Sequence, residues 1–386
     1  MKKVFFNVRI SSRERMWDTA REAARVCEPM LPAVKQRTSI KRAIDAKSGK
    51  YRLRGHVKRL LFRTLPILNR QSVAEAGDAE LLYLWGAFPK DSRKPFVVEL
   101  DNPFVITYYR LWAFFRRRKT LIKRFAAAQA ITFMSETARQ HTLALLGEGA
   151  SALVPKTHTL YPFTEQNYKG NRRVGDGLTR FLFVGLGFRR KGGPELLEAF
   201  SRVFDETLRL TVIAPVEDDV IERYKHDTRI TFLPPQSREE LFAEYYPTHD
   251  IFIFPSLLET FGVVILEALS FGMGIITTDV YATPELVTDG VNGRLLKHPF
   301  LERTQLGELE RVDCITIDRS DLAAEYTSQS LYEQLVCDLK QAITQAVQDK
   351  HTWQAGSERL FNERFAPAVW EQTLTTVIGG PAADRS

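Results

Sequence analysis

One stretch of the chain predicts the fold around it: Phe254-Pro-Ser-Leu-Leu-Glu-Thr-Phe-Gly-Val-Val-Ile-Leu-Glu-Ala-Leu-Ser-Phe-Gly272. An apolar strand at 251–254 ends at a proline. An apolar helix is expected from about residue 261 to the glycine at 272, because glycine favours helix ends. Glu259 therefore precedes the helix, and Glu267 lies on it.

The start of this helix is a candidate anion site. We expect the N–H groups of Phe261, Gly262 and Val263 to face outward there, with a carboxylate on either side. For Glu267 the alternative is a solvated charge on a surface helix. The helix is apolar on nearly every side, however, and a charge on a buried helix must be paired or line a polar cavity.

Strand-like apolar runs alternate with helical stretches along the whole chain, which favours βα units and parallel sheets. The fold class expected is α/β, with two Rossmann-like doubly wound domains that face each other across an interdomain cleft. The expected strands lie at 4–8, 81–85, 96–100, 130–134, 181–184, 210–213, 230–233, 251–254 and 275–277.

The expected domain boundaries follow these two sets of strands. An N-terminal domain is placed at 1–165 and a C-terminal domain at 166–360. A C-terminal helix at 361–386 is a candidate to pack back on the N-terminal domain. The polar stretch 155–178 is interpreted as a linker.

A second motif follows the strand at 181–184, in Phe183-Val-Gly-Leu-Gly-Phe-Arg-Arg-Lys-Gly-Gly193. Gly185 and Gly187 begin a dinucleotide fingerprint, but arginine stands where its third glycine belongs. A loop that ends in Arg189, Arg190 and Lys191 would hold phosphate through side-chain charge. An exposed basic turn is the alternative.

Composition narrows the class of protein. Of 386 residues 44% are hydrophobic, which supports real cores, and the net charge of +7 favours anionic partners. Neither a secretory signal nor an apolar run of the ~18 residues that span a bilayer is seen. Three scattered cysteines suggest no disulfide framework, so a reducing cytoplasm is expected. Without Asp-x-Asp or metal-spaced histidines, we expect no metal and no cofactor.

Two basic regions lie in the N-terminal half, at 35–63 and at 108–125. The second mixes aromatic residues with arginine and lysine and is expected to be a basic amphipathic helix. Such helices lie on anionic membrane surfaces, here the inner face of the cell membrane. An ordinary domain helix with a solvated basic face is the alternative.

Taken together, the motifs over residues 180–295 resemble the nucleotide-sugar domain of the GT-B-fold retaining glycosyltransferases of family four, the glycosyl transferases group 1. The match extends from the strand at 181–184 through both glutamates to Pro284-Glu-Leu-Val-Thr-Asp-Gly-Val-Asn-Gly293. The N-terminal half matches only in outline. The resemblance implies that the domain at 1–165 binds the acceptor and that the domain at 166–360 binds the nucleotide sugar.

The resemblance implies a role for each matching residue. Lys191 and Arg190, beside Gly185, would bind the donor diphosphate, and Glu267 would hold the nucleotide ribose. The backbone at 261–263 would hold the sugar and the distal phosphate, and Glu259 would contact the transferred sugar near the reacting carbon.

The activity that the resemblance implies is retaining, metal-independent transfer of a hexose or related sugar. The donor would be UDP- or GDP-linked. The acceptor would be a glycan hydroxyl, lipid-linked as in lipopolysaccharide, exopolysaccharide or glycolipid synthesis. Asp101 stands where many members carry a histidine on the acceptor side, and Leu186 stands where arginine is common.

Two other functions remain open from the sequence. A non-catalytic GT-B module could bind a nucleotide sugar or a partner, although the glutamate pair and Lys191 argue against it. A nucleic-acid-binding protein would fit the net charge, but the chain has no recognised nucleic-acid module, and no nucleic-acid partner is expected.

Overall fold

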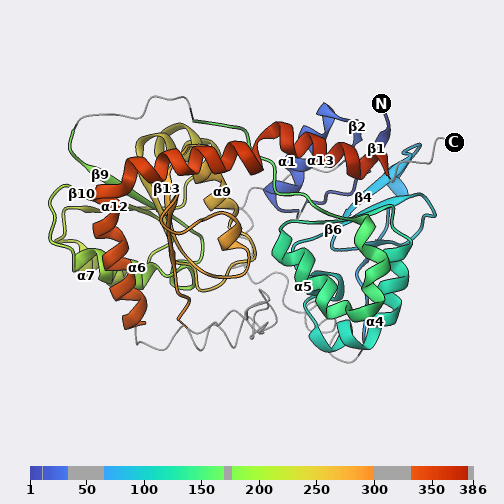
Figure 1. Cartoon of the computed structure of the whole chain (residues 1–386), viewed down its shortest axis with the longest axis horizontal. Coiled ribbons are helices and arrows are strands. Elements are labelled where there is room, and N and C mark those ends of the chain that lie inside the picture. Colours follow the sequence, from blue (N-terminus) through green and yellow to red (C-terminus); the bar gives the residue numbers. More distant parts are fainter. Residues whose placement is uncertain (11, 34–64, 169–175, 300–331, 381–386) are drawn as a thin grey trace. The chain divides into compact units, whose positions relative to one another are not determined.

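The computed structural model describes residues 1–10, 12–33, 65–168, 176–299 and 332–380 (Figure 1). The chain divides into two compact units, Met1–Phe163 together with Pro367–Ser386, and Thr164–Ala366. The basic stretch expected at 35–63 lies outside the described residues.

Unit 1 is built on a parallel sheet with the strand order β2-β1-β4-β6-β7-β8. All side chains of β4 and β6 are buried, as is typical of parallel strands covered on both faces. The strands of this unit are β1 (Lys3–Phe6), β2 (Glu28–Met30), β3 (Arg70–Gln71), β4 (Leu81–Trp85), β5 (Phe88–Pro89), β6 (Phe96–Leu100), β7 (Ala130–Phe133) and β8 (Thr157–Thr159).

Helices connect these strands. The helix α5 starts where the side chain of Ser135 accepts a hydrogen bond from the N–H of Ala138, a normal N-cap. The helical segments are α1 (Glu14–Glu22), η1 (Ala23–Arg25), η2 (Ala74–Ala76), η3 (Pro103–Thr107), α4 (Leu111–Ala126), α5 (Glu136–Leu146), η4 (Gly147–Lys156) and α13 (Pro367–Gly379).

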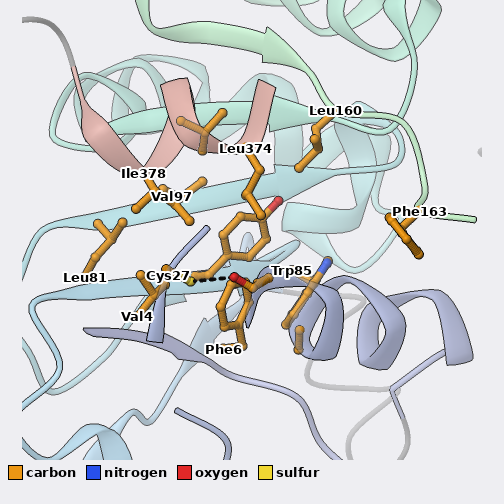
Figure 2. Packing of buried hydrophobic residues seen from close by; sticks show 14 of the residues in the cluster. Val4, Phe6, Cys27, Leu81, Trp85, Val97, Leu160, Phe163, Leu374 and Ile378 are labelled. Carbon is orange, nitrogen blue, oxygen red and sulfur yellow. Dashed lines mark hydrogen bonds between the residues drawn. The ribbon is translucent and has the colours of Figure 1, made fainter. Parts of the chain in front are cut away.

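The C-terminal helix α13 completes the core of unit 1. Trp370, Leu374, Val377 and Ile378 join a buried cluster with side chains of β1, β4 and β6. Figure 2 shows Leu374 and Ile378 lying against side chains of the sheet. The last helix of the chain therefore packs with its first strands.

The basic helix differs from its prediction. It begins at Leu111, not at 108, because Tyr108 and Tyr109 adopt left-handed backbone angles, with φ of 55° and 60°. Part of its apolar surface is buried within unit 1, where Phe114 packs on Phe104 with ring centroids 5.5 Å apart.

Unit 2 carries a second parallel sheet with the order β11-β10-β9-β12-β13-β14. Its strands are β9 (Thr179–Val184), β10 (Leu208–Ile213), β11 (Ile230–Leu233), β12 (Ile251–Phe254), β13 (Gly274–Thr278) and β14 (Gly293–Leu296). All the strands expected in this half are present.

The long helix α12 runs alongside this sheet and packs on α6, β13 and β14 (Figure 1). The helical segments of unit 2 are η5 (Arg189–Lys191), α6 (Gly193–Ser201), α7 (Asp218–Tyr224), α8 (Arg238–Glu240), η6 (Leu241–Tyr245), η7 (Tyr246–Thr248), α9 (Val263–Ser270), η8 (Thr283–Glu285), α12 (Glu333–Leu360) and η9 (Phe361–Phe365).

The expected linker at 155–178 is partly wrong. Its first residues end η4 and form β8, which pairs with β7. Thr157-His-Thr159 is short and polar, so only its pairing with β7 identifies it as a strand.

Candidate functional site

The two sequence motifs meet at the carboxyl edge of the unit 2 sheet. The strands β9 and β12 are neighbours and run parallel, with Ile251 paired to Phe181 and Phe252 to Leu182. The loop after β9 carries the basic turn, and the loop after β12 carries Glu259. Ligands of such sheets bind at this edge.

A glycine allows the two loops to touch. Gly192 has a φ of +72°, and a Cβ atom there would lie 2.2 Å from the carbonyl oxygen of Pro255. The N–H of Leu257 also donates to the carbonyl of Arg190, at 3.0 Å. The basic turn is therefore held directly against the end of β12.

Lys191 lies in this contact and is 9% exposed. Its Nζ lies 2.6 Å from Oε2 of Glu259, 2.8 Å from the carbonyl oxygen of Leu258 and 3.3 Å from Oγ of Ser256. It also lies over the ring of Phe254, 5.1 Å from the centroid. The residue predicted to bind phosphate and the residue predicted to contact the sugar are thus paired with each other.

The Glu259 carboxylate is stabilised in its charged form. Burial by itself would raise its pKa. The charge and hydrogen bond of Lys191, together with the N–H groups of Thr260 and Phe261, outweigh burial and lower the pKa to about 2. Oε1 accepts from those N–H groups at 2.9 and 3.4 Å. The N–H of Phe261, expected to face outward, instead donates to this carboxylate.

The loop that carries Glu259 has a further buried support. The ring nitrogen Nε2 of His298 donates to the carbonyl of Leu257 at 3.1 Å, and His298 is 2% exposed. Burial lowers the pKa of His298 to about 4, so the ring is neutral at neutral pH.

Glu267 is buried on α9, as its apolar surroundings predicted, and both its oxygens have partners. The hydroxyl of Tyr246 donates to Oε2 at 3.0 Å. The guanidinium of Arg238 forms an ion pair with Oε1, with Nε 2.8 Å away. Neither partner was identified from the sequence, although an arginine and a tyrosine near a buried glutamate are the side chains that could neutralise and orient it.

The remaining residues predicted on the donor side also surround this edge. Gly185 directly follows β9, and a Cβ atom there would lie 3.4 Å from the side chain of Lys191. Gly262 is the N-cap of α9 with a φ of 92°, Phe261 is fully buried, and Val263 is the first helical residue. Arg189 lies apart from them in an exposed pair with Glu217.

Asp101 belongs to unit 1, directly after β6. It is 6% exposed, and the side-chain amide of Asn102 donates to its Oδ1 at 3.1 Å. On β6 itself, Glu99 pairs with Arg15 and accepts a hydrogen bond of 2.7 Å from Tyr83. This buried polar network was not predicted, because it joins residues that are distant in sequence.

Over the described ranges, no group of three or more His, Cys, Asp or Glu side chains could hold a metal ion. In the same part of the chain, no helix is both long and apolar enough to cross a bilayer.

Similarity to a known protein family covers the stretch of the chain that carries these residues. The family model for glycosyl transferases group 1 matches residues 179–301. D-inositol 3-phosphate glycosyltransferase of Mycolicibacterium gilvum is 37% identical over 119 residues, which are 30% of this chain. The matched stretch spans only 27% of that relative's length.

Solved structures match over nearly the whole chain at low identity. Anabaena HepE in complex with UDP and glucose has a TM-score of 0.59 at 13% identity, over 98% of this chain and 99% of that one. The lipopolysaccharide outer core galactosyltransferase WaaB has a TM-score of 0.56 at 14% identity, with the same coverage. With its two parallel-sheet Rossmann-like units, the chain has the predicted GT-B fold.

Proposed function

We propose that this chain, whose residues 179–301 match the family model for glycosyl transferases group 1, transfers a sugar from a UDP- or GDP-linked donor to a glycan hydroxyl. The observation that carries the proposal is the buried Lys191–Glu259 pair, with a nitrogen–oxygen distance of 2.6 Å at the carboxyl edge of the sheet. HepE, which shares the fold, is described in complex with UDP and glucose.

The proposed reaction exchanges one bond at the anomeric carbon. The bond from this carbon to the phosphate oxygen breaks, and its electron pair leaves with the diphosphate. The acceptor oxygen bonds to the same carbon from the face that the diphosphate leaves, which retains the configuration. The acceptor proton passes to the departing phosphate.

Each charge in that transition state has a side chain to stabilise it. Negative charge grows on the diphosphate, where Lys191 with Arg190 supplies cations. Positive charge grows on the sugar ring, where the Glu259 carboxylate is suited to hold hydroxyl groups. Because these cations come from the chain itself, we propose that no metal and no cofactor are needed. A chelator such as EDTA should then leave turnover unchanged.

Glu267 is proposed to hold the two ribose hydroxyls. A carboxylate accepts both, and Tyr246 with Arg238 fixes its orientation before the donor arrives. Pre-orientation lowers the entropy that is lost on binding.

The acceptor is proposed to be a lipid-linked glycan, as in lipopolysaccharide, exopolysaccharide or glycolipid synthesis. WaaB is described as a lipopolysaccharide outer core galactosyltransferase. Asp101, at the carboxyl edge of the unit 1 sheet, is the side chain we propose on the acceptor side.

We propose that the protein is cytoplasmic and binds the membrane peripherally. A surface at the start of α4 supports this proposal. Leu111, Trp112 and Phe115 are 38%, 41% and 47% exposed, and four exposed basic residues follow at 116–119. Aromatic side chains beside cations suit an anionic lipid surface.

The membrane proposal is tested by sedimentation with anionic vesicles at low salt. Serine at both Trp112 and Phe115 should abolish co-sedimentation. Serine at Phe204, which is 96% exposed on unit 2, is the matched control. If the wild-type chain stays in the supernatant, α4 is an ordinary helix with a solvated basic face.

The donor is identified by a thermal-shift screen against UDP, GDP, ADP and their sugars, because a bound ligand stabilises the native state. Lys191→Ala should reduce the shift and abolish the transfer. Lys225→Ala, at an exposed lysine of the same unit, should change neither. Donor binding without transfer to any glycan would favour the non-catalytic module.

A further inference from the structure

We propose that the Glu259 carboxylate is an internal substitute for the donor phosphate: it occupies Lys191 until a diphosphate displaces it. Glu259 is then released toward the sugar that the same donor delivers. This inference rests on the proposed function and concerns how Lys191 in the same site becomes available to the donor diphosphate.

The hydrogen-bonding capacity of Lys191 is filled in the structure. An ammonium group has three N–H donors. Three acceptors surround Nζ within 3.3 Å, from Ser256, Leu258 and Glu259. A phosphate oxygen can therefore bind Lys191 closely only if one of these acceptors leaves.

Glu259 is the acceptor that can leave. Ser256 is fully buried, and its hydroxyl donates to the carbonyl of Leu258 at 2.9 Å, so these two acceptors fix each other. The Glu259 carboxylate ends a side chain with rotatable bonds that is 18% exposed. It can turn away by rotation about its own side-chain bonds, which gives up its contacts with Lys191, Thr260 and Phe261.

The contacts of the carboxylate match those of a bound anion. One oxygen lies against the Lys191 ammonium, and the other accepts from the N–H groups of Thr260 and Phe261. Cations and backbone N–H groups are also the usual partners of phosphate oxygens.

The charge of the incoming ligand decides whether Glu259 leaves. Lys191 is nine-tenths buried, and a buried ammonium without a counter-charge is strongly unfavourable. A diphosphate replaces the lost negative charge, whereas a nucleoside or a free sugar does not. The pair should therefore weaken the binding of every anion at Lys191 and leave neutral ligands unaffected.

The test is the affinity for inorganic pyrophosphate, which needs no knowledge of the base, measured by titration calorimetry on the full chain. Glu259→Gln keeps the shape of the side chain and removes its charge. We expect pyrophosphate, and UDP or GDP, to bind this variant about tenfold more tightly than the wild-type chain. Equal or weaker binding overturns the inference.

Two controls isolate the pair. Glu217→Gln removes an exposed carboxylate beside Arg189 on the same turn, and it should change the affinity much less than Glu259→Gln. In a Lys191→Ala background, Glu259→Gln should no longer increase the affinity for pyrophosphate. If the affinity still increases there, the cause is the loss of one negative charge from the protein and not the loss of the Lys191–Glu259 pair. That outcome also overturns the inference.

The remaining outcomes separate this inference from the proposed function. If the wild-type chain binds nucleoside diphosphates and Glu259→Gln weakens that binding, the proposed displacement of Glu259 is wrong, but the proposed donor site is still supported. If neither protein binds pyrophosphate, UDP or GDP, both are wrong. If Glu259→Gln fails to fold, Glu259→Asp replaces it in the test. Its shorter side chain pairs less closely with Lys191, so this variant must bind pyrophosphate more tightly than the wild-type chain.

Discussion

The hydroxyl of Tyr246 donates a 3.0 Å hydrogen bond to Oε2 of Glu267, and both side chains are buried. Burial and the nearby carboxylate raise the pKa of Tyr246 well above its usual range, so the hydroxyl keeps its proton and remains a donor. Tyr246 is thus a positioning residue for the carboxylate that we propose binds the ribose.

We predict that Tyr246→Phe weakens binding of the donor nucleotide about tenfold, because the Glu267 carboxylate then loses the hydrogen bond that fixes its orientation, worth about 1–3 kcal/mol. Titration calorimetry with UDP and GDP measures the change. The neighbouring Tyr245→Phe, at a partly exposed tyrosine, is the control and should bind normally. Equal affinities in the two variants would contradict a role for Tyr246.

The contact between Gly192 and Pro255 gives a prediction with an internal control. Gly192 and Gly177 share a φ of +72°, but a Cβ atom at position 177 would meet nothing within 4 Å. Gly177→Ala should cost only the left-handed strain of about 1–2 kcal/mol. Gly192→Ala adds a clash with backbone, so we expect at least ~2 kcal/mol of further destabilisation. Unfolding in urea compares the variants, and similar midpoints would exclude the close approach.

His298 should make unit 2 sensitive to acid. Its pKa of about 4 in the folded protein lies below the ordinary value of 6.5. The unfolded chain therefore takes up the proton first. The stabilisation is complete above pH 6.5 and is lost as the pH falls toward 4, by on the order of 3 kcal/mol.

The matched variant is His298→Gln, which keeps an N–H donor for Leu257 and does not titrate. We predict that its melting temperature falls less than that of the wild-type chain between pH 7 and 4. His141, whose pKa burial also lowers to about 4, is present in both proteins and cancels in the comparison. Parallel melting curves over this range would contradict a neutral, buried His298.

The described cysteines should differ sharply in reactivity. Cys337 is exposed, whereas Cys27 is 1% exposed and burial raises its pKa to about 12. In a Cys314→Ser background, a thiol reagent such as DTNB should modify one cysteine quickly in the native protein, and Cys337→Ser should remove that phase. Cys27 should react only when unit 1 unfolds, so rapid labelling of two thiols would contradict its burial.

Much of the fold could be predicted because it depends on local pattern. The strands β4, β6, β11 and β12 have the predicted bounds, since each is a short apolar run next to polar, glycine or proline residues. By contrast, β8 and β14 are short and partly polar, and α4 begins three residues later than predicted. Only strand pairing and the backbone angles at Tyr108 and Tyr109 decide those boundaries.

Local pattern along the chain specifies the two α/β units and the motif set over 180–295, and it points to the residues that we propose for the donor side. The spacing of residues along a strand, turn and helix is a local property, so it does not depend on contacts with the rest of the chain. Which charged side chains contact each other depends on the tertiary structure. Lys191 and Glu259 lie 68 residues apart, and Tyr246 and Glu267 lie 21 apart. Lys191 and Glu259 pair because the parallel strands β9 and β12 bring their loops to one edge. Tyr246 and Glu267 pair between the helical segments that precede and follow β12. In both places a buried charge must find a partner.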